Sequence, residues 1–364
     1  MKNLIGYKNG IVSSIISDND HLTIVNVDVE GNTYKAVNYK EFTGDVNVED
    51  KVVLNTTAMD LSLGTGGYHF IMYNFRNKFM ETKGPGHIMK LRYTPYQMKC
   101  LAAEEEDSPY HNVFNEFKSL DNHVFIVATL HSMIAPITAM IKYLNNNIKI
   151  NYIMTDGGAL PLYFSNTISE LKNKKIIDKT ITIGHAFGGD LECINIYTGL
   201  IAAKEILKGD VTIISMGPGI VGSGTKYGFT GIEQGHIVDA INNLKGMAVS
   251  VPRISFKDKR NRHYGISHHT ITTLSEMTNT RSNLILPYLE QEKENHIIEQ
   301  IEKAGIKEKH NIIFEDGEKI VMVMEKFNLK TTSMGRSIED DIDYFITLGA
   351  VGNYTANLFE ERRV

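Results

Sequence analysis

One pattern repeats along the chain from about residue 120: a short apolar run, a turn rich in Gly, His or Asp, and a stretch of helical length. Each apolar run is typical of a strand buried on both faces, and each following stretch can serve as the helix of a parallel crossover. The predicted strands are Val124–Ala128, Asn151–Met154, Thr180–Ile183, Val211–Ser215, Met247–Val251 and Leu284–Leu286. The predicted helices include Leu162–Lys172, Ile194–Leu207 and Gln234–Leu244. This repetition predicts an α/β fold with a mainly parallel, doubly wound, Rossmann-like sheet.

The first 75 or so residues follow a different period. Apolar and polar residues alternate in Val25–Val29, the segment Glu30–Thr33 has turn composition, and Tyr34–Val37 starts another strand. Several short strands without a clear helix predict a small antiparallel β-barrel or β-sandwich. The breaker cluster Lys83–Gly86 places the domain boundary near residue 85, which gives domains 1–85 and 86–364.

The C-terminal part of the larger domain departs from the repeat. Ile312–Phe314 and Ile320–Val323 are apolar runs that flank Asp316-Gly317, a dipeptide suited to a tight turn. We therefore predict a β-hairpin there. Ser337 is the candidate N-cap of a last helix.

Composition excludes several classes of protein. Lys and Arg number 38 against 43 Asp and Glu, a net charge of −5, so the whole chain has no electrostatic attraction for nucleic acid or an anionic membrane. Two cysteines and an N-terminus without an apolar run predict a cytoplasmic protein. Val124–Ile141 is uncharged over the length of a membrane span, but His131, Ser132 and Pro136 interrupt it. A strand followed by a helix explains this stretch better, so no membrane partner is expected.

The residues that follow each predicted strand are the first candidates for function, because ligands of parallel sheets bind beyond the carboxyl ends of the strands. Asp156 and His185 occupy such positions and are candidates for acid–base catalysis. The next turn supplies the candidate ligand-binding residues Gly217, Gly219, Gly222, Gly224 and Thr225. Its glycines fit the spacing G-x-G-x-x-G, yet further glycines follow where a dinucleotide site needs a helix, and the P-loop pattern is also incomplete. The turn is interpreted either as an anion cradle or as a long turn whose glycines serve tight packing.

Cations and histidines crowd into the stretch 253–269. Arg253 and Arg262 are candidate ligands for a carboxylate or phosphate, and His268 and His269 are candidate catalytic groups. Because an unperturbed histidine titrates near pH 6.5, we expect an anion bound here to bind more tightly as the pH falls from about 8 to 6. The alternative is a solvated loop whose histidines bond to backbone carbonyls.

No metal site is predicted from the sequence. His131, Asp156, His185 and Asp190 have suitable ligand atoms, but none of the established metal-binding spacings joins them. Ser132 lacks a nucleophile elbow, and the sequence identifies no cofactor.

Several segments together resemble a known family. They are Met216–Gly219, Gly222–Thr225, Arg253–Phe256, Arg262-His263, Ser267–Thr270 and Met334–Arg336. With Asp156–Pro161, they resemble an uncharacterised bacterial family known as domain of unknown function number 3866. The resemblance covers nearly the whole chain and implies no activity or catalytic residue.

Three function hypotheses follow from the residues. The first is an enzyme that acts on a small anionic, phosphorylated or nucleotide-like metabolite at the C-terminal edge of the sheet. The second is a non-catalytic sensor that binds the same class of ligand. The third is an interaction protein that forms a homo-oligomer through its β domain.

Overall fold

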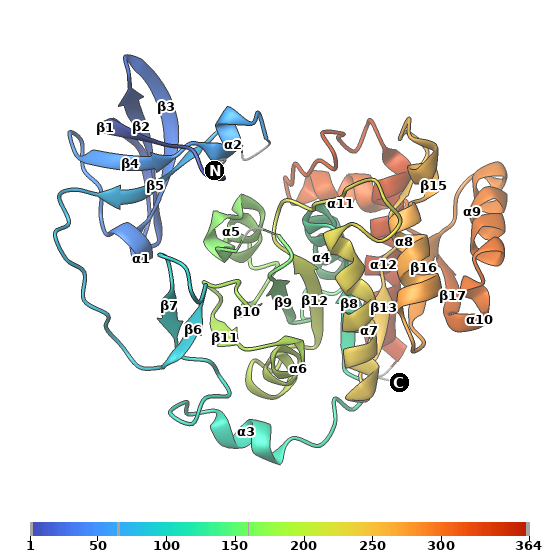
Figure 1. Ribbon diagram of the computed structural model, residues 1–364. Coiled ribbons are helices and arrows are strands. Elements are labelled where there is room, and N and C mark those ends of the chain that lie inside the picture. Colours follow the sequence, from blue (N-terminus) through green and yellow to red (C-terminus); the bar gives the residue numbers. More distant parts are fainter. Residues whose placement is uncertain (1–2, 64–65, 159, 362–364) are drawn as a thin grey trace. The chain divides into compact units, whose positions relative to one another are not determined.

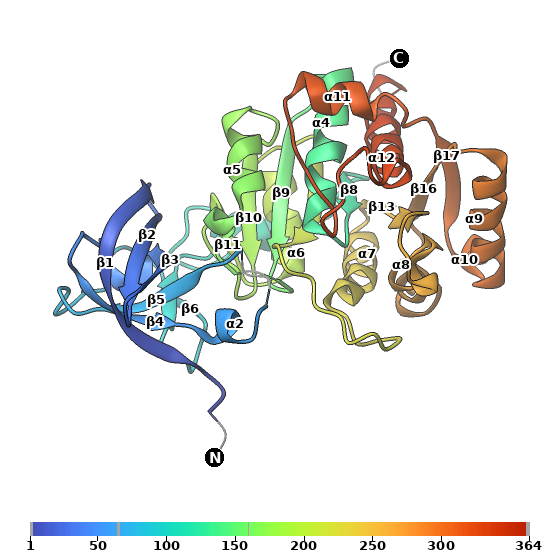
Figure 2. The ribbon, with the colours of Figure 1, turned by 90° about the horizontal axis from the view of Figure 1, so that it is seen from above.

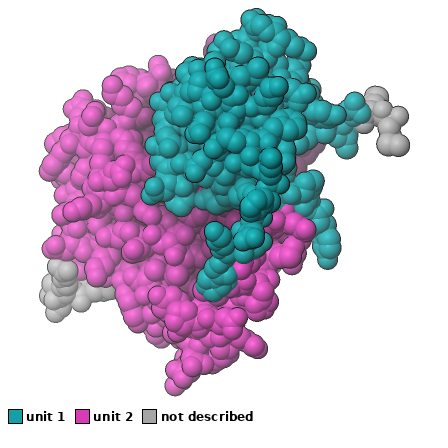
Figure 3. Space-filling model, turned by 90° about the vertical axis from the view of Figure 1, so that its left-hand side faces the viewer, with its two compact units in different colours: residues 1–85, 93–96 teal, residues 86–92, 97–364 magenta. Residues whose placement is uncertain are grey.

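The computed structural model describes residues 3–63, 66–158 and 160–361, and the chain divides into two compact units (Figure 3). The smaller unit comprises Met1–Pro85 and Tyr93–Tyr96. The larger unit comprises Gly86–Arg92 and Gln97–Val364. The short segment 93–96 thus belongs to the smaller unit although it lies beyond residue 85 in the sequence.

The smaller unit is a closed five-stranded barrel with the strand order β1-β2-β3-β5-β4. Its strands are β1 (Tyr7–Asp18), β2 (Leu22–Val29), β3 (Asn32–Tyr39), β4 (Lys51–Asn55) and β5 (His69–Asn74). The β2–β3 turn has positive φ at Glu30 and Gly31, as the tight hairpin turn predicted there requires. Alternate residues such as Val25 and Val27 are buried in the barrel core, so the β-barrel predicted from the period-two pattern is confirmed. It is not antiparallel throughout, because β3 and β5 pair in parallel.

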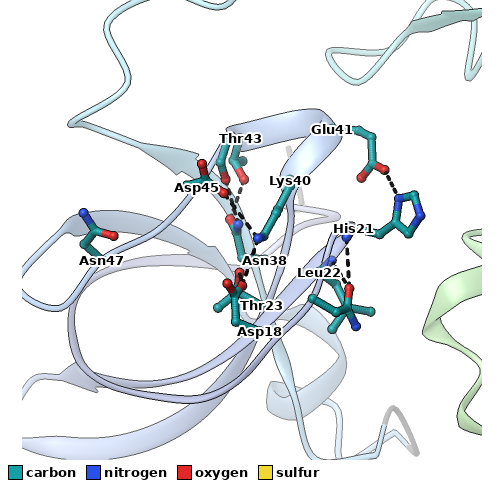
Figure 4. Close-up of polar contacts among 12 residues, drawn as sticks. Asp18, His21, Leu22, Thr23, Asn38, Lys40, Glu41, Thr43, Asp45 and Asn47 are labelled. Carbon is teal, nitrogen blue, oxygen red and sulfur yellow. Dashed lines mark hydrogen bonds and ion pairs between the residues drawn. The ribbon is translucent and has the colours of Figure 1, made fainter.

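Two single-turn helices, α1 (Lys40–Thr43) and α2 (Thr57–Asp60), join the barrel strands. Figure 4 shows the polar contacts between α1 and the barrel strands. The Lys40 ammonium pairs with Asp18 and Asp45 at 3.0 and 3.3 Å, and the buried Thr43 hydroxyl donates to the side chain of Asn38 at the end of β3. The buried bond contributes more than the exposed ion pairs, because water screens the latter.

The larger unit is built on an eight-stranded sheet in which all the pairings are parallel. Its strand order is β11-β10-β9-β12-β8-β13-β16-β17 (Figure 1). The strands are β8 (Val124–Val127), β9 (Ile150–Thr155), β10 (Lys179–Ile183), β11 (Leu191–Cys193), β12 (Val211–Met216), β13 (Met247–Ser250), β16 (Asn283–Pro287) and β17 (Asn311–Glu315). Two small antiparallel pairs lie outside the sheet: β6 (Ile88–Lys90) with β7 (Met98–Cys100), and β14 (Ile254–Ser255) with β15 (Gly265–Ile266).

Helices cover both faces of this sheet (Figure 2). Those packed on one face are α4 (Ile134–Leu144), α5 (Asn166–Asn173), α11 (Ile320–Lys326) and α12 (Ile342–Glu361). Those on the other face include α6 (Ile196–Ile201), α7 (Glu233–Asn243) and α9 (Gln291–Lys303). The remaining helices are α3 (His111–Glu116), α8 (His268–Thr272) and α10 (Ile306–Lys309). Neighbouring strand residues point to opposite faces, so Ile126 packs with α4 and Phe125 with the opposite helices.

The stretch 124–141 comprises strand β8, a turn and part of α4, as the sequence indicated. No helix within the described residues combines the length and the apolar character needed to cross a bilayer.

The predicted C-terminal hairpin is wrong. Ile312–Phe314 lies in β17, which pairs in parallel with β16, and the second apolar run forms helix α11. Ile320, Val323 and Met324 are its buried residues, and this spacing suits a helix. Gly317 serves close packing, since a Cβ there would overlap the backbone of α12 at Ile346.

The start of the last helix also differs from the prediction. Helix α12 begins at Ile342, so Ser337 is not its N-cap. The Ser337 hydroxyl instead donates to Asp340 at 2.9 Å and to Glu339 at 2.7 Å, within a turn that precedes the helix. Sequence reasoning also missed the short edge strand β11.

The topology creates a switch point between β8 and β12, which are neighbours in the sheet. The chain leaves β8 through α4 to reach β9 on one side, and it leaves β12 through α7 to reach β13 on the other. Open parallel sheets bind ligands beyond the carboxyl ends of strands at such a point. The residues that follow β8, β9 and β12 therefore define where a site can form.

Candidate functional site

Turns from four strands meet at the C-terminal edge of the sheet. Nδ1 of His131, after β8, lies 3.1 Å from the carbonyl oxygen of Met216 at the end of β12. The Asp156 carboxylate, after β9, accepts a hydrogen bond of 3.0 Å from the backbone N–H of His185, after β10. A Cβ on Gly158 would lie 2.5 Å from the Gly217 carbonyl oxygen. The residues that sequence reasoning selected after the strands thus come together at one edge.

A carboxyl group that sequence reasoning missed, Glu233, lies beside Asp156. Glu233 is the first residue of α7, and its Oε1 accepts a hydrogen bond of 2.5 Å from the Thr155 hydroxyl. Burial raises the pKa of Glu233 to about 7; the bond from Thr155 opposes this rise, and the negative charge of Asp156 adds to it. Asp156 itself is exposed. Two neighbouring carboxyl groups in unlike environments are suited to proton transfer near neutral pH.

His131 and Ser132 have structural roles. Nε2 of His131 lies 2.6 Å from the Ser165 hydroxyl, and with Met216 on Nδ1 both ring nitrogens are engaged. Burial lowers the pKa of His131 to about 4, so the ring is neutral. The Ser132 hydroxyl bonds to the buried Tyr344 hydroxyl at 2.9 Å, which supplies no base.

His185 and Asp190 are also tied within the chain. Nδ1 of His185 accepts a hydrogen bond of 3.0 Å from the backbone N–H of Leu91. Asp190 accepts bonds from the backbone N–H and the hydroxyl of Thr180, at 2.8 and 2.7 Å, and from Lys172 at 2.9 Å. Lys172 and Thr180 hold the pKa of Asp190 below its usual value although burial opposes them.

The glycine-rich turn after β12 forms a lobe, residues 217–230, which we call the glycine lobe. It folds back as a hairpin, in which Gly222 bridges to Phe229 and the Ser223 N–H donates to the Gly228 carbonyl at 2.7 Å. The Thr225 hydroxyl bonds to Ser223 at 2.8 Å. The lobe therefore does not lead directly into a helix as a dinucleotide or P-loop motif would, and several of its polar groups bond to one another.

The stretch 253–269 projects from the small β14–β15 hairpin and forms what we call the Arg–His cluster. Arg253 is buried, and its guanidinium is occupied within the chain by Asp258 at 3.1 Å and by Nδ1 of His263 at 2.9 Å. Asp258 also pairs with Arg260 at 2.8 Å. Arg253 was expected to bind the ligand; in the structure its guanidinium is buried and bonded within the cluster. Arg262 is exposed and has no carboxylate partner among residues that the structure describes.

Three histidines gather in this cluster. His263 ends a short 3₁₀ turn, and His268 and His269 begin α8; their potential ligand atoms all lie within 4.8 Å of one another. The His269 ring stacks on Phe229 of the glycine lobe, with centroids 4.0 Å apart and an interplanar angle of 11°. A Cβ on Gly222 would lie 3.7 Å from Cε1 of His269. The glycine lobe and the Arg–His cluster thus pack against each other.

These histidines are neutral at physiological pH. Burial, aided by neighbouring arginines, lowers the pKa of His263 to about 3 and that of His269 to about 4, and it also lowers the pKa of His268. His263 and His269 do not gain charge between pH 8 and 6, so neither ring supplies the rise of anion affinity expected over that range. A neutral ring carries one N–H donor and one lone pair, which suits hydrogen bonding or metal coordination.

The segment 229–233 links the two groups of side chains. Phe229 stacks on His269, and four residues later Glu233 lies beside Asp156. Among the described residues, the ligand atoms of His131, Asp156, His185 and Asp190 do not lie close enough together to share a metal ion, whereas those of His263, His268 and His269 do.

Together these features define an α/β protein with a parallel sheet, a closed barrel, and polar side chains gathered at the C-terminal edge of the sheet. The chain belongs to the family described as protein of unknown function (DUF3866), whose model matches residues 35–352. This match confirms the resemblance in the glycine and histidine segments. No curated protein matches the sequence.

Proposed function

We propose that this protein is an enzyme that acts on a small anionic metabolite, phosphorylated or nucleotide-like, at the C-terminal edge of the parallel sheet. The observation that carries the proposal is the pairing of Glu233, whose pKa is about 7, with Asp156 beside the switch point of the sheet. A general acid or base is most effective when its pKa lies near the working pH. In this proposal the larger unit acts as a Rossmann-like domain, with its ligand beyond the strand ends.

The roles of the two carboxyl groups follow from their environments. Glu233 is largely buried and can accept or release a proton near pH 7, while the Thr155 hydroxyl orients its Oε1. Asp156 is exposed, and the His185 N–H fixes one of its oxygens. Glu233 is therefore the proton-transfer group, and Asp156 positions the substrate and stabilises positive charge that develops on it.

Arg262 provides the charge for an anionic substrate. Its guanidinium is exposed and lies near the glycine lobe, where a Cβ on Gly224 would be 3.8 Å from Nη2. Arginine binds phosphate and carboxylate through two parallel hydrogen bonds. The exposed backbone around Gly219, which has open space on its Cβ side, leaves room for the substrate.

We expect Arg262→Gln to weaken the binding of phosphorylated ligands by about 10- to 100-fold, which corresponds to the loss of one charge-assisted hydrogen bond. The measurement is calorimetric titration with inorganic phosphate, pyrophosphate and a panel of nucleotides and sugar phosphates. Lys259→Gln is the matched control, since Lys259 is an exposed cation of the same loop and has no ion pair among the described side chains. Equal losses of affinity in both variants would show that binding responds to the net charge of the loop and not to Arg262 in particular, which would contradict the proposal.

We expect Gly219→Val to abolish ligand binding and leave a folded protein. Gly219 has φ of +102°, so valine strains the backbone there and its side chain enters the open space beside the lobe. Gly84→Val imposes similar strain at φ of +80° in the smaller unit and should leave binding unchanged. Loss of the cooperative thermal transition in Gly219→Val would instead support the packing interpretation of the glycines.

The proposal also includes a cytoplasmic location, and it leaves a sensor as the alternative to an enzyme. The two free cysteines, Cys100 and Cys193, support a cytoplasmic location. Saturable binding across the panel with no turnover would favour a sensor over an enzyme.

A further inference from the structure

The three histidines of the Arg–His cluster face one another closely. The ring centroid of His263 lies 4.9 Å from that of His268 and 5.1 Å from that of His269, and the centroids of His268 and His269 are 4.2 Å apart. In a tetrahedral site, metal–nitrogen bonds of about 2.0–2.1 Å place imidazole rings at comparable separations. We propose that His263, His268 and His269 bind a divalent transition-metal ion of the zinc class.

Ring nitrogens of His268 and His269 are open to such an ion. Nε2 of His268 is buried without a hydrogen-bond partner, and neither ring nitrogen of His269 bonds to any side chain or backbone group that the structure describes. Leaving a polar atom buried and unpaired is costly, and a metal ion would remove that cost. The stacking of His269 on Phe229 holds its ring in place.

His263 joins the set through its second nitrogen. Its Nδ1 lies 2.7 Å from the Ser267 hydroxyl, and donation from a protonated Nδ1 to that hydroxyl leaves the lone pair on Nε2. The Arg262 Nε–H lies 3.4 Å from this Nε2, so a metal ion takes the lone pair in place of that donor. Arg253 donates to Nδ1 at 2.9 Å in the metal-free protein, so metal binding moves the ring proton to Nδ1 and ends this bond. Asp258, at 3.1 Å, is then the hydrogen-bond partner that Arg253 retains.

The charges and ligand atoms around the site determine which metal ion and which fourth ligand it prefers. Asp258 pairs with Arg253 and Arg260, and Asp341 pairs with Arg336 at 2.9 Å, which offsets part of the repulsion that these arginines exert on a cation. Arg262 remains unpaired by carboxylates within the described chain and favours an anion in the fourth coordination position. Three neutral nitrogen ligands suit zinc, copper, nickel or iron rather than magnesium or calcium, which prefer oxygen.

The test uses the full-length protein after dialysis against a chelator. Co²⁺ is added while the visible absorption of tetrahedral cobalt is recorded, and Zn²⁺ is then titrated by calorimetry with no metabolite present. We expect about one equivalent of each metal to bind, with Mg²⁺ giving no effect. His269→Gln should lower the Zn²⁺ affinity by at least about 100-fold, more than the loss of a supporting residue around a metal causes.

His236→Gln, on the exposed face of α7, is the matched control and should retain wild-type metal affinity. His268→Gln serves as a second ligand variant if His269→Gln does not give a wild-type thermal transition in chelator. Absence of cobalt absorption in the wild-type protein, or unchanged zinc affinity in a folded ligand variant, would overturn the proposal. Since no metabolite is used, this failure is distinct from failure of the enzyme proposal.

Discussion

Glu233→Gln is expected to stabilise the folded protein at pH 8 by up to about 3 kcal/mol, with a smaller gain toward pH 5. The pKa of Glu233 is raised from 4.5 to about 7 in the folded state. The folded protein therefore holds a proton that the unfolded chain releases, and stability falls as the pH rises from about 4.5 to about 7. Glutamine resembles the protonated acid and accepts the same bond from Thr155, so it avoids the cost of a buried charge.

Urea unfolding at pH 5 and pH 8 measures this difference. Glu292→Gln on α9 is the control, because Glu292 is exposed and forms no ion pair within the described residues. A stability change in Glu233→Gln that is equal at the two pH values would show that the carboxyl group does not titrate between them.

The same substitution separates a catalytic role from a structural one. If Glu233 transfers the proton, Glu233→Gln should reduce turnover of any substrate found by about 10²- to 10⁴-fold while the protein becomes more stable. Loss of activity together with a gain of stability is typical of a strained functional site. Unchanged turnover in the stabilised variant would exclude Glu233 from the reaction.

The sequence predicts the central sheet well because buried parallel strands have a strong local signal. Val124–Val127 and Val211–Met216 are short apolar runs followed by polar turns, and both are strands of the sheet. The edge strand β11 has only three residues, one of them Glu192, and carries no such signal. Helix α11 was assigned to a strand because four consecutive apolar residues fit either element until their packing is known.

The site was only partly predictable for a related reason. The glycine and histidine segments are distinctive in sequence, and the structure places them together. Glu233, however, is a typical residue for the first turn of a helix, and its raised pKa comes from burial against Thr155 and Asp156, which are distant in sequence. Likewise, Arg253 cannot be distinguished from Arg262 until the first is seen to be buried and paired and the second exposed.

Asp258 is a carboxylate that several arginines of the Arg–His cluster and its surroundings share. Its side chain is buried, and it accepts hydrogen bonds from Arg253 and Arg260, with Arg336 3.8 Å away. The bond from Arg260, strengthened by Arg253, holds the pKa of Asp258 well below its usual value, so the group is ionised throughout the neutral range. One carboxylate therefore balances several arginines, of which Arg253 is withdrawn from water.

We expect Asp258→Ala to destabilise the protein by about 3–5 kcal/mol, because it leaves the Arg253 guanidinium buried and uncompensated. Arg260→Gln removes a partner of the same carboxylate, but 43 % of the Arg260 side chain is exposed, so its loss should cost less than about 1 kcal/mol. Guanidinium unfolding of the two variants compares the costs directly. Similar small costs in both would mean that Arg253 reaches water when Asp258 is absent, and the cluster would then be a solvated loop rather than a prearranged site.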